Sequence, residues 1–219
     1  MLFEQASQLV NKVLSESFNE KYAVYDYRQD ARSLNSDWYN SFKKITDKYL
    51  QPYNIEKSII NVGVGSGEEA IQLFSKYKNI SFVDIAPGGL KNIAESLTTA
   101  HTFLLRAESL AKIKDNTYDI YISLRTYNSS FFDTSLALKE ARRVLKNDGV
   151  IIISVANGFL CVDNHIIPGL IIPGLEFVDI YRGLNLAKNL LLSCKNLDFE
   201  SMEIYPTNTE IYIIGKLNK

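Results

Sequence analysis

The sequence is poor in the residues that build metal centres, disulfide frameworks and membrane spans. Its 219 residues include only two cysteines and two histidines. Cys161 and Cys194 lack the spacing of metal ligands, so we expect neither a zinc site nor a disulfide framework. No apolar run reaches membrane-spanning length, and residues 1–13 lack the basic start and long apolar core of a signal peptide. These absences predict a cytoplasmic protein that binds no metal.

The chain also lacks an excess of charge of either sign. Its 24 lysines and arginines balance 25 aspartates and glutamates, which gives a formal net charge of −1. Because nucleic-acid-binding proteins usually present a basic face, this balance argues against a nucleic-acid partner. A hydrophobic content of 46% indicates a folded core rather than disorder. The length fits one α/β domain with a small cap.

The most informative stretch predicts a strand, a glycine-rich turn and a helix in succession. Residues 58–62 form the short apolar run of a buried parallel strand. Gly63, Gly65 and Gly67 then fall at alternate positions, and helical spacing begins directly after them. Glycine allows a ligand close to the backbone, and a helix N-terminus offers free N–H groups. The turn is therefore suited to a small polar ligand, although a tight turn without a ligand has the same pattern.

The spacing of the glycines excludes two common phosphate-binding loops. A dinucleotide fingerprint needs its third glycine at position 68, where Glu68 would face a pyrophosphate at close range. A P-loop needs a following Gly-Lys-Ser or Gly-Lys-Thr, which is absent. The remaining G-x-G-x-G spacing resembles the first motif of the class I S-adenosylmethionine-dependent methyltransferases. Their ligand carries no phosphate, so acidic residues beside the loop are tolerable.

The next predicted strand, 80–84, ends in an acid. Asp84 is 17 residues beyond Gly67, close to the spacing at which an acid binds ribose hydroxyls, and a carboxylate can accept from both hydroxyls. An ordinary aspartate at a strand-end turn is the alternative. Ligands of parallel sheets lie beyond the carboxyl ends of the strands, where Asp84, Glu108 and residues 125–127 would meet the glycine turn.

Strands alternate with helices along the rest of the chain, which predicts an α/β fold. We expect a doubly wound, Rossmann-like, mostly parallel seven-stranded sheet with a terminal antiparallel hairpin and an N-terminal helical cap. The further predicted strands are 101–105, 118–124, 150–155, 199–205 and 210–216, and a turn at Asp148-Gly149 precedes the strand at 150. The predicted helices are 3–17, 38–50, 68–77, 87–97, 133–145 and 183–194. The cap would cover residues 1–54, and the main domain 55–219 would carry an irregular insert at 157–182.

Four segments, within about residues 56–156, together resemble the class I methyltransferases of the small-molecule type. They are "NVGVGSGE", "VDIAPGGL", "RAESLAKIKDNTYDIYIS" and "ALKEARRVLKNDGVIIIS". The resemblance implies that the glycines back the methionine part of S-adenosylmethionine, Asp84 binds its ribose and Glu108 meets its adenine. The full set of implied cofactor-binding residues is Asn61, Gly63, Gly65, Gly67, Asp84, Ile85, Ala107, Glu108 and Leu124.

Two positions depart from the pattern of that family. Asn61 stands where an acid usually precedes the first glycine by two. Arg106 replaces the aspartate that usually precedes the Ala-Glu pair. An arginine cannot accept from the adenine amino group, so Glu108 or a backbone carbonyl would have to do so.

Methyl transfer from a sulfonium requires alignment and exclusion of water more than a strong base or a metal. The expected catalytic residues are Tyr127 and His165. Tyr127 follows the fourth predicted strand, where the family places residues between cofactor and acceptor. His165, in the insert, could accept a proton from a phenol or amine, and a surface-loop histidine is the alternative. The residues expected to bind the acceptor are Tyr22, Tyr27, Arg28, Arg125 and Asn128. These aromatic and basic groups suggest a small acceptor that carries an acid group and is methylated on oxygen or nitrogen. The chain contains no Asp/Asn-Pro-Pro-Tyr motif, and this absence argues against methylation of an exocyclic base amine or a glutamine amide.

Two alternatives stay open at this stage. The chain could methylate a peptide, a protein or RNA, or it could be a catalytically silent fold that binds S-adenosylmethionine, which the two departures would permit. The first would be favoured by a basic face beside the pocket. We expect a monomer or homodimer with a small-molecule partner, no membrane association and no metal.

Overall fold

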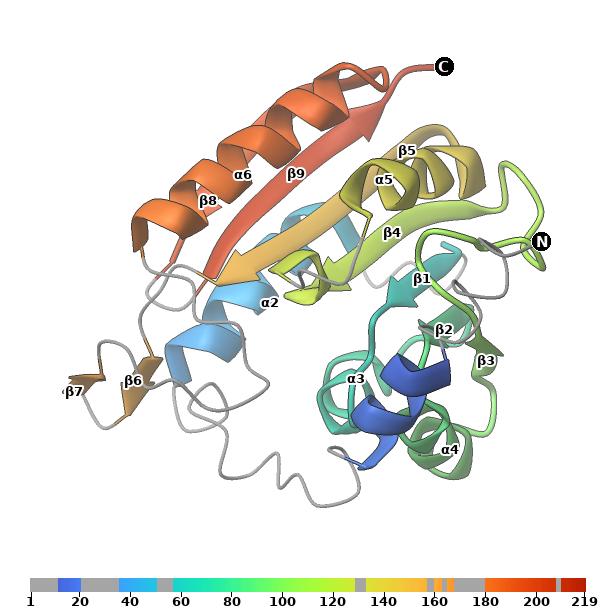
Figure 1. Ribbon diagram of the computed structural model, residues 1–219. Helices are drawn as coiled ribbons and strands as arrows, with labels where there is room; N and C mark the ends of the chain where they lie inside the picture. Colours follow the sequence, from blue (N-terminus) through green and yellow to red (C-terminus); the bar gives the residue numbers. More distant parts are fainter. Residues whose placement is uncertain are drawn as a thin grey trace.

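The computed structural model describes residues 12–20, 36–50, 57–128, 133–156, 160–162, 165–167, 180–207 and 210–219 (Figure 1). Its main feature is a seven-stranded sheet in the order β3-β2-β1-β4-β5-β9-β8. The strands are β1 (Ile59–Val62), β2 (Ile80–Asp84), β3 (His101–Leu104), β4 (Tyr118–Leu124), β5 (Leu145–Ala156), β8 (Phe199–Pro206) and β9 (Glu210–Leu217). The first five are parallel, and β9 lies antiparallel between β5 and β8. This topology confirms the predicted doubly wound sheet with its terminal hairpin.

Helices cover both faces of the sheet. They are α2 (Ser36–Leu50), α3 (Glu68–Phe74), α4 (Pro87–Ser96), α5 (Thr134–Val144), α6 (Ile180–Lys195) and the short 3₁₀ helix η2 (Thr126–Asn128). Residues 12–20 are also helical, while the start of the predicted helix 3–17 lies outside the described residues. Local chemistry sets the helix starts: Pro87 occupies the first turn of α4, and the Asp133 side chain caps α5 by accepting from Leu136 N.

Two apolar layers fill the space between sheet and helices. Strands β1 and β2 are buried along their whole length, which explains why their sequences are mostly apolar. One layer joins the sheet to α2, α3 and α4 and includes Phe42, Phe74, Phe82, Ile93 and Tyr212. The other joins it to α5 and α6 and includes Tyr121, Leu138, Ala141, Val155 and Ala187. Burial of each large side chain contributes roughly 1.5–3 kcal/mol, so these layers hold the strand ends in fixed positions.

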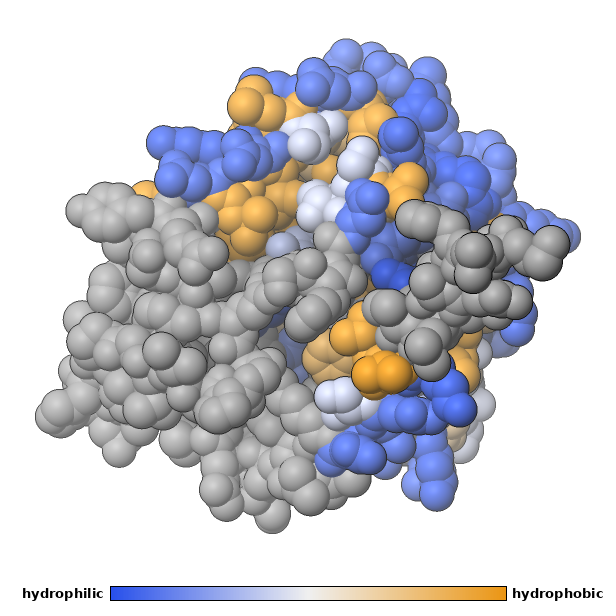
Figure 2. All heavy atoms as spheres, viewed as in Figure 1, coloured by the Kyte–Doolittle hydropathy of each residue, from blue (hydrophilic) through white to orange (hydrophobic). Residues whose placement is uncertain are grey.

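The surface is mixed rather than uniformly polar. Figure 2 shows hydrophilic residues around the described part of this face, with hydrophobic residues between them over α6. Leu192 of α6 is 57% exposed, and Leu136 of α5 is also exposed. Within the described residues, no helix is long and apolar enough to cross a membrane.

The main differences from the sequence prediction lie in α3, in β5 and in the insert. Helix α3 ends at Phe74 instead of residue 77. Strand β5 begins at Leu145, and the predicted turn at Asp148 lies within it as a residue with a φ of 61°. The insert, predicted to be irregular, contains the paired short strands β6 (Leu160–Val162) and β7 (His165–Ile167). In the sequence, Asp163-Asn164 separates these strands, and such a polar pair is typical of a hairpin connection, a pattern that was not predicted.

Candidate functional site

The glycine turn joins the end of β1 to the start of α3. Gly63, Gly65 and Gly67 all have positive φ, at 81°, 60° and 85°, which a side chain would strain. The N–H of Gly63 donates to the carbonyl of Val83, at 2.8 Å. A Cβ added to Gly63 would overlap the side chain of Thr126, which follows β4. The turn therefore needs glycine for both its backbone conformation and its packing.

The first turn of α4 closes the other side of the glycine turn. A Cβ added to Gly89 would overlap the carbonyl oxygen of Gly65. Asn92 Nδ2 donates to the carbonyl of Ser66, at 3.0 Å. The Gly88-Gly89 pair thus permits a close approach of two backbones. Elements that follow β2 and β4 hold the turn between them, so its shape is set before any ligand binds.

Asp84 ends β2 beside this turn. Its Oδ2 accepts from Gly65 N at 2.9 Å, and its Oδ1 accepts from Ala86 N at 2.7 Å. Burial raises the pKa of Asp84 to about 6, although the hydrogen bonds from Ala86 and Gly65 act in the opposite direction. A carboxylate oxygen can accept more than one hydrogen bond, so these two bonds alone do not saturate Asp84.

The helix at 12–20 lies against the connection from β2 to α4 (Figure 1). Ser15 Oγ donates to the carbonyl of Ile85, at 2.6 Å, and Asn19 Oδ1 accepts from Gly88 N, at 2.9 Å. Both contacts lie within four residues of Asp84 in the chain. Part of the predicted cap thus reaches the same edge of the sheet as the glycine turn.

The segment after β3 adjoins Asp84 on its other side. Leu105 N donates to the backbone carbonyl of Asp84, at 3.0 Å. Arg106 and Glu108 form an ion pair across the following turn, with 2.6 Å between Nη2 and Oε1. Ala107, between them, is buried. The predicted contacts of β1, β2 and β3 therefore converge on one edge of the sheet.

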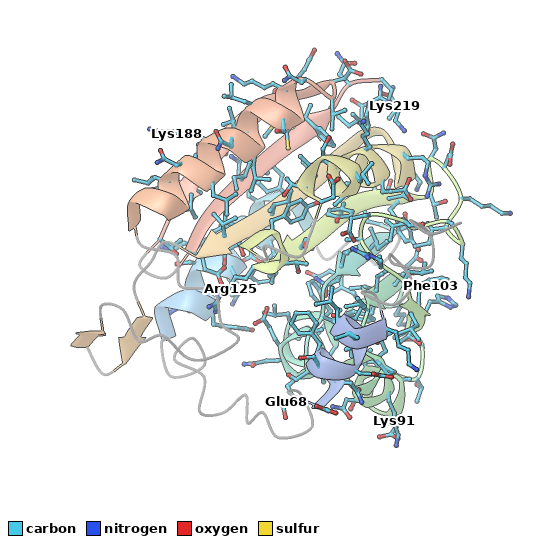
Figure 3. All side chains as sticks on the ribbon, in the orientation of Figure 1. Glu68, Lys91, Phe103, Arg125, Lys188 and Lys219 are labelled. Atoms are coloured by element: carbon cyan, nitrogen blue, oxygen red, sulfur yellow. The ribbon has the colours of Figure 1, made fainter. Side chains whose placement is uncertain are left out.

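A second charged pair lies where β4 and β5 end. Arg125 has a φ of 61°, an unusual conformation for a residue with a side chain. Its N–H donates to the carbonyl of Ser154 at 2.9 Å, and its Nε lies 3.9 Å from Oε1 of Glu210, at the start of β9. Glu210 is fully buried. Figure 3 shows Arg125 beside the ends of β4 and β5.

Known proteins share this arrangement. A family profile described as a methyltransferase domain matches residues 60–153, the segment that contains the glycine turn, Asp84 and the Arg106–Glu108 pair. By this match, residues 60–153 resemble a methyltransferase domain. The seven-stranded sheet, parallel except for β8 and β9, is the Rossmann-like fold of that family.

Relatives of the methyltransferase domain act on varied acceptors according to their names. The chain is 33% identical over 156 residues to the ubiquinone/menaquinone biosynthesis C-methyltransferase UbiE of Rickettsia typhi, covering 64% of this chain and 58% of that protein. The N-methyltransferase NodS of Bradyrhizobium japonicum, solved with S-adenosylhomocysteine, has a TM-score of 0.64 at 8% identity, over 94% of this chain and 98% of that one. The 1,6-didemethyltoxoflavin-N1-methyltransferase of Burkholderia thailandensis has a TM-score of 0.60 at 10% identity, over 99% and 90%.

One predicted catalytic residue of the methyltransferase domain lies in the core. Tyr127 is 2% exposed, and its hydroxyl lies 3.2 Å from the hydroxyl of Tyr121. Burial raises the pKa of Tyr127 well above its ordinary value. A buried hydroxyl facing another tyrosine cannot reach an acceptor at the edge of the sheet, so this placement does not support the prediction for Tyr127.

Several predicted contacts cannot be compared with the structure. Tyr22, Tyr27 and Arg28 lie outside the described residues. Asn128 and His165 are described only by their backbones, in η2 and β7. Their proposed roles stay predictions. Of the remaining cofactor residues, Asn61 and Leu124 are buried at 3% and 8% exposure, within β1 and at the end of β4.

Other residues that were not predicted also shape the site. Thr126 and Gly89 enclose the glycine turn, and Glu210 pairs with Arg125. The sequence marks two of them. Gly89 belongs to a pair of glycines at the start of a predicted helix, and Glu210 is an acid at the start of an apolar strand. Among the residues that the structure describes, no group of three or more histidines, cysteines or acids could hold a metal ion.

Proposed function

We propose that the chain is an S-adenosylmethionine-dependent methyltransferase that transfers a methyl group to an oxygen or nitrogen atom of a small molecule. The observation that carries the proposal is the junction of Asp84 with the glycine turn. That junction places a carboxylate, a half-buried glycine backbone and a helix start at one edge of the sheet. The chain spans 58% of the length of its UbiE relative, so the acceptor of that protein is not inferred for this chain.

The residues at this edge fit the cofactor. The positive-φ glycines leave room at the turn for the amino acid end, and Asp84 has acceptor capacity for the two ribose hydroxyls. Ile85 and Ala107 flank the place for the base. When bound, S-adenosylmethionine supplies a methyl group on a positively charged sulfur. Transfer of that methyl group leaves a neutral thioether.

The chain's own contribution is orientation. Asp84 and Gly65 are joined before any ligand arrives, so little reorganisation is needed on binding. Thr126 and Gly89 prevent the turn from shifting to either side. Such an arrangement would hold the cofactor in one position, and transfer from it would need no strong base, in keeping with the buried position of Tyr127.

Arg125 supports an acceptor that carries an acid group. Its guanidinium lies at the carboxyl end of β4, on the same edge of the sheet as the glycine turn, and Glu210 restricts its orientation. The arginine side chain is 24% exposed. A carboxylate or phosphate on the acceptor could therefore reach it from solvent and be bound by its N–H groups.

Transfer to carbon is a second candidate, because the UbiE relative is named as a C-methyltransferase. Incubation with S-adenosylmethionine carrying a ¹³C-labelled methyl group, together with fractionated small molecules, peptides and RNA, tests both candidates. The proposal expects label in the small-molecule fraction, and the ¹³C chemical shift of the product distinguishes O-, N- and C-methyl groups. Label confined to peptide or RNA, or none with any fraction, would overturn the small-molecule proposal.

A further inference from the structure

The segment that follows β3 is placed to contact the base of a bound nucleoside. Strand β2 lies between β1 and β3 in the sheet, so the glycine turn, Asp84 and residues 105–108 follow one another along its edge. Leu105 N is bonded to the backbone of Asp84 at 3.0 Å. A ligand with its amino acid end at the glycine turn and its ribose at Asp84 would extend its base toward residues 105–108. This placement rests on the proposed function.

The carboxylate in this segment is already bound by an arginine. Arg106 donates to Glu108 twice, from Nη2 to Oε1 at 2.6 Å and from Nε to Oε2 at 3.2 Å. Oε1 of Glu108 also accepts from Asp133 N, at 3.2 Å. The glutamate side chain is only 9% exposed, and the arginine 27%. Each oxygen of Glu108 therefore already accepts from the protein, Oε1 twice, and the side chain presents little surface to a ligand.

The arginine itself supplies only donors at this place. Its guanidinium has no acceptor atom, and its backbone carbonyl accepts from Ser109 N, at 3.1 Å. The exocyclic amino group of adenine is also a donor. The amino group would therefore face the Arg106 guanidinium, which is also a donor, instead of a free carboxylate that could accept from it.

We propose that the Arg106–Glu108 ion pair sets the purine specificity of the cofactor site, by withholding a side-chain acceptor from the 6-position of the base. A site that reads a donor through a dedicated acceptor rejects analogues lacking that donor by large factors. A site whose carboxylate is already paired loses that discrimination. The chain therefore binds a hypoxanthine nucleoside, which carries a carbonyl at this position, nearly as well as an adenine nucleoside.

Isothermal titration calorimetry with S-adenosylhomocysteine and S-inosylhomocysteine tests the inference without a turnover assay. The wild-type affinities are expected to differ by about tenfold or less, the size of one ordinary hydrogen bond. Arg106→Ala releases the Glu108 carboxylate to accept from the amino group, so the preference for adenine should rise about tenfold or more. Arg106→Gln fills more of the space and serves in its place if the alanine variant does not fold.

Arg142→Ala is the matched control. Arg142 also pairs with a carboxylate, Asp198, but from α5 to the segment before β8. Its removal should leave the ratio of the two affinities unchanged. A wild-type preference for adenine of about a hundredfold or more, or an unchanged ratio in a folded Arg106 variant, would overturn the inference. Failure of the folded wild-type protein to bind either ligand would instead overturn the proposed function, and the inference with it.

Discussion

Oδ2 of Asp84 accepts a hydrogen bond from the backbone N–H of Gly65, at 2.9 Å, and thereby joins the end of β2 to the middle of the glycine turn. The other oxygen, Oδ1, accepts from Ala86 N at the start of α4. One buried carboxylate thus fixes two backbone segments that a nucleoside would touch. The predictions on cofactor binding depend on this junction.

Replacement of Asp84 by alanine should weaken binding of S-adenosylhomocysteine about 10- to 100-fold at pH 8. The variant loses the acceptor for the ribose hydroxyls and the bond that positions Gly65, and bonds to charged groups contribute about 1.5–3 kcal/mol. Calorimetry on the folded variant measures the change. Asp119→Asn is the control. Asp119 also accepts from a backbone N–H, that of Ser58, but it lies at the start of β4, at the edge of the sheet opposite Asp84. Equal affinities for wild type and Asp84→Ala would contradict the ribose assignment.

The affinity for S-adenosylhomocysteine should rise with pH between 5 and 7. Burial raises the pKa of Asp84 to about 6, and ligand hydroxyls donate to the ionised carboxylate, so protonation competes with binding. At pH 5 only about a tenth of the carboxylate is ionised, which predicts an affinity about tenfold lower than above pH 7. Titrations at several pH values measure this slope. A slope that persists in Asp84→Asn would assign the titration to another group.

Gly63→Ala should lower the free energy of unfolding by about 2–4 kcal/mol. The added methyl group overlaps Thr126, and a φ of 81° costs a residue with a side chain about 1–2 kcal/mol. Thr126→Gly in the same chain removes the overlap but not the backbone strain. Urea denaturation should therefore show that Gly63→Ala destabilises the Thr126→Gly variant less than it destabilises the wild type, but still measurably. Full additivity of the two substitutions would show that Gly63 and Thr126 do not meet.

The Arg125–Glu210 pair should show strong coupling in a double-mutant cycle. Arg125→Met leaves the fully buried Glu210 carboxylate without its neighbouring guanidinium and should cost about 3–5 kcal/mol of unfolding free energy. Arg125→Met combined with Glu210→Gln should cost less than the sum of the single changes, by about 1 kcal/mol or more. The cycle is measured by urea denaturation. Lys48 and Glu203 form an exposed pair for comparison, where the coupling should stay below about 1 kcal/mol.

Much of the fold is predictable because the apolar pattern reports burial directly. Strands β1 and β2 are buried on both faces and have mostly apolar sequences. Asp133 is an N-cap residue and marks the start of α5. The extended start of β5 was missed because Lys146 to Gly149 reads as a turn, and Asp148 does adopt a positive φ there. A short polar segment of this kind becomes part of a strand when it pairs with a neighbouring strand, which its own sequence does not show.

The site was predictable only where a local motif marks it. The glycine turn and Asp84 lie in motifs with fixed spacing, and both reach the same edge of the sheet. The pairing of Arg125 with Glu210 joins residues far apart in the chain, and only the antiparallel placement of β9 beside β5 brings them together. Tyr127 was expected at the acceptor because it follows β4, but its side chain turns into the core toward Tyr121. Side-chain direction after a strand end is set by packing, which the sequence pattern does not report.

Titration of the wild-type protein with S-adenosylmethionine, S-adenosylhomocysteine and NAD in the calorimeter tests the central claim most directly. The glycine turn and Asp84 predict saturable, one-to-one binding of the two sulfur nucleosides, with no comparable binding of NAD, whose pyrophosphate would meet Glu68. Binding of NAD in preference to both, or no heat of binding with any of the three while the protein is folded, would contradict the assignment of this edge of the sheet as a site for S-adenosylmethionine.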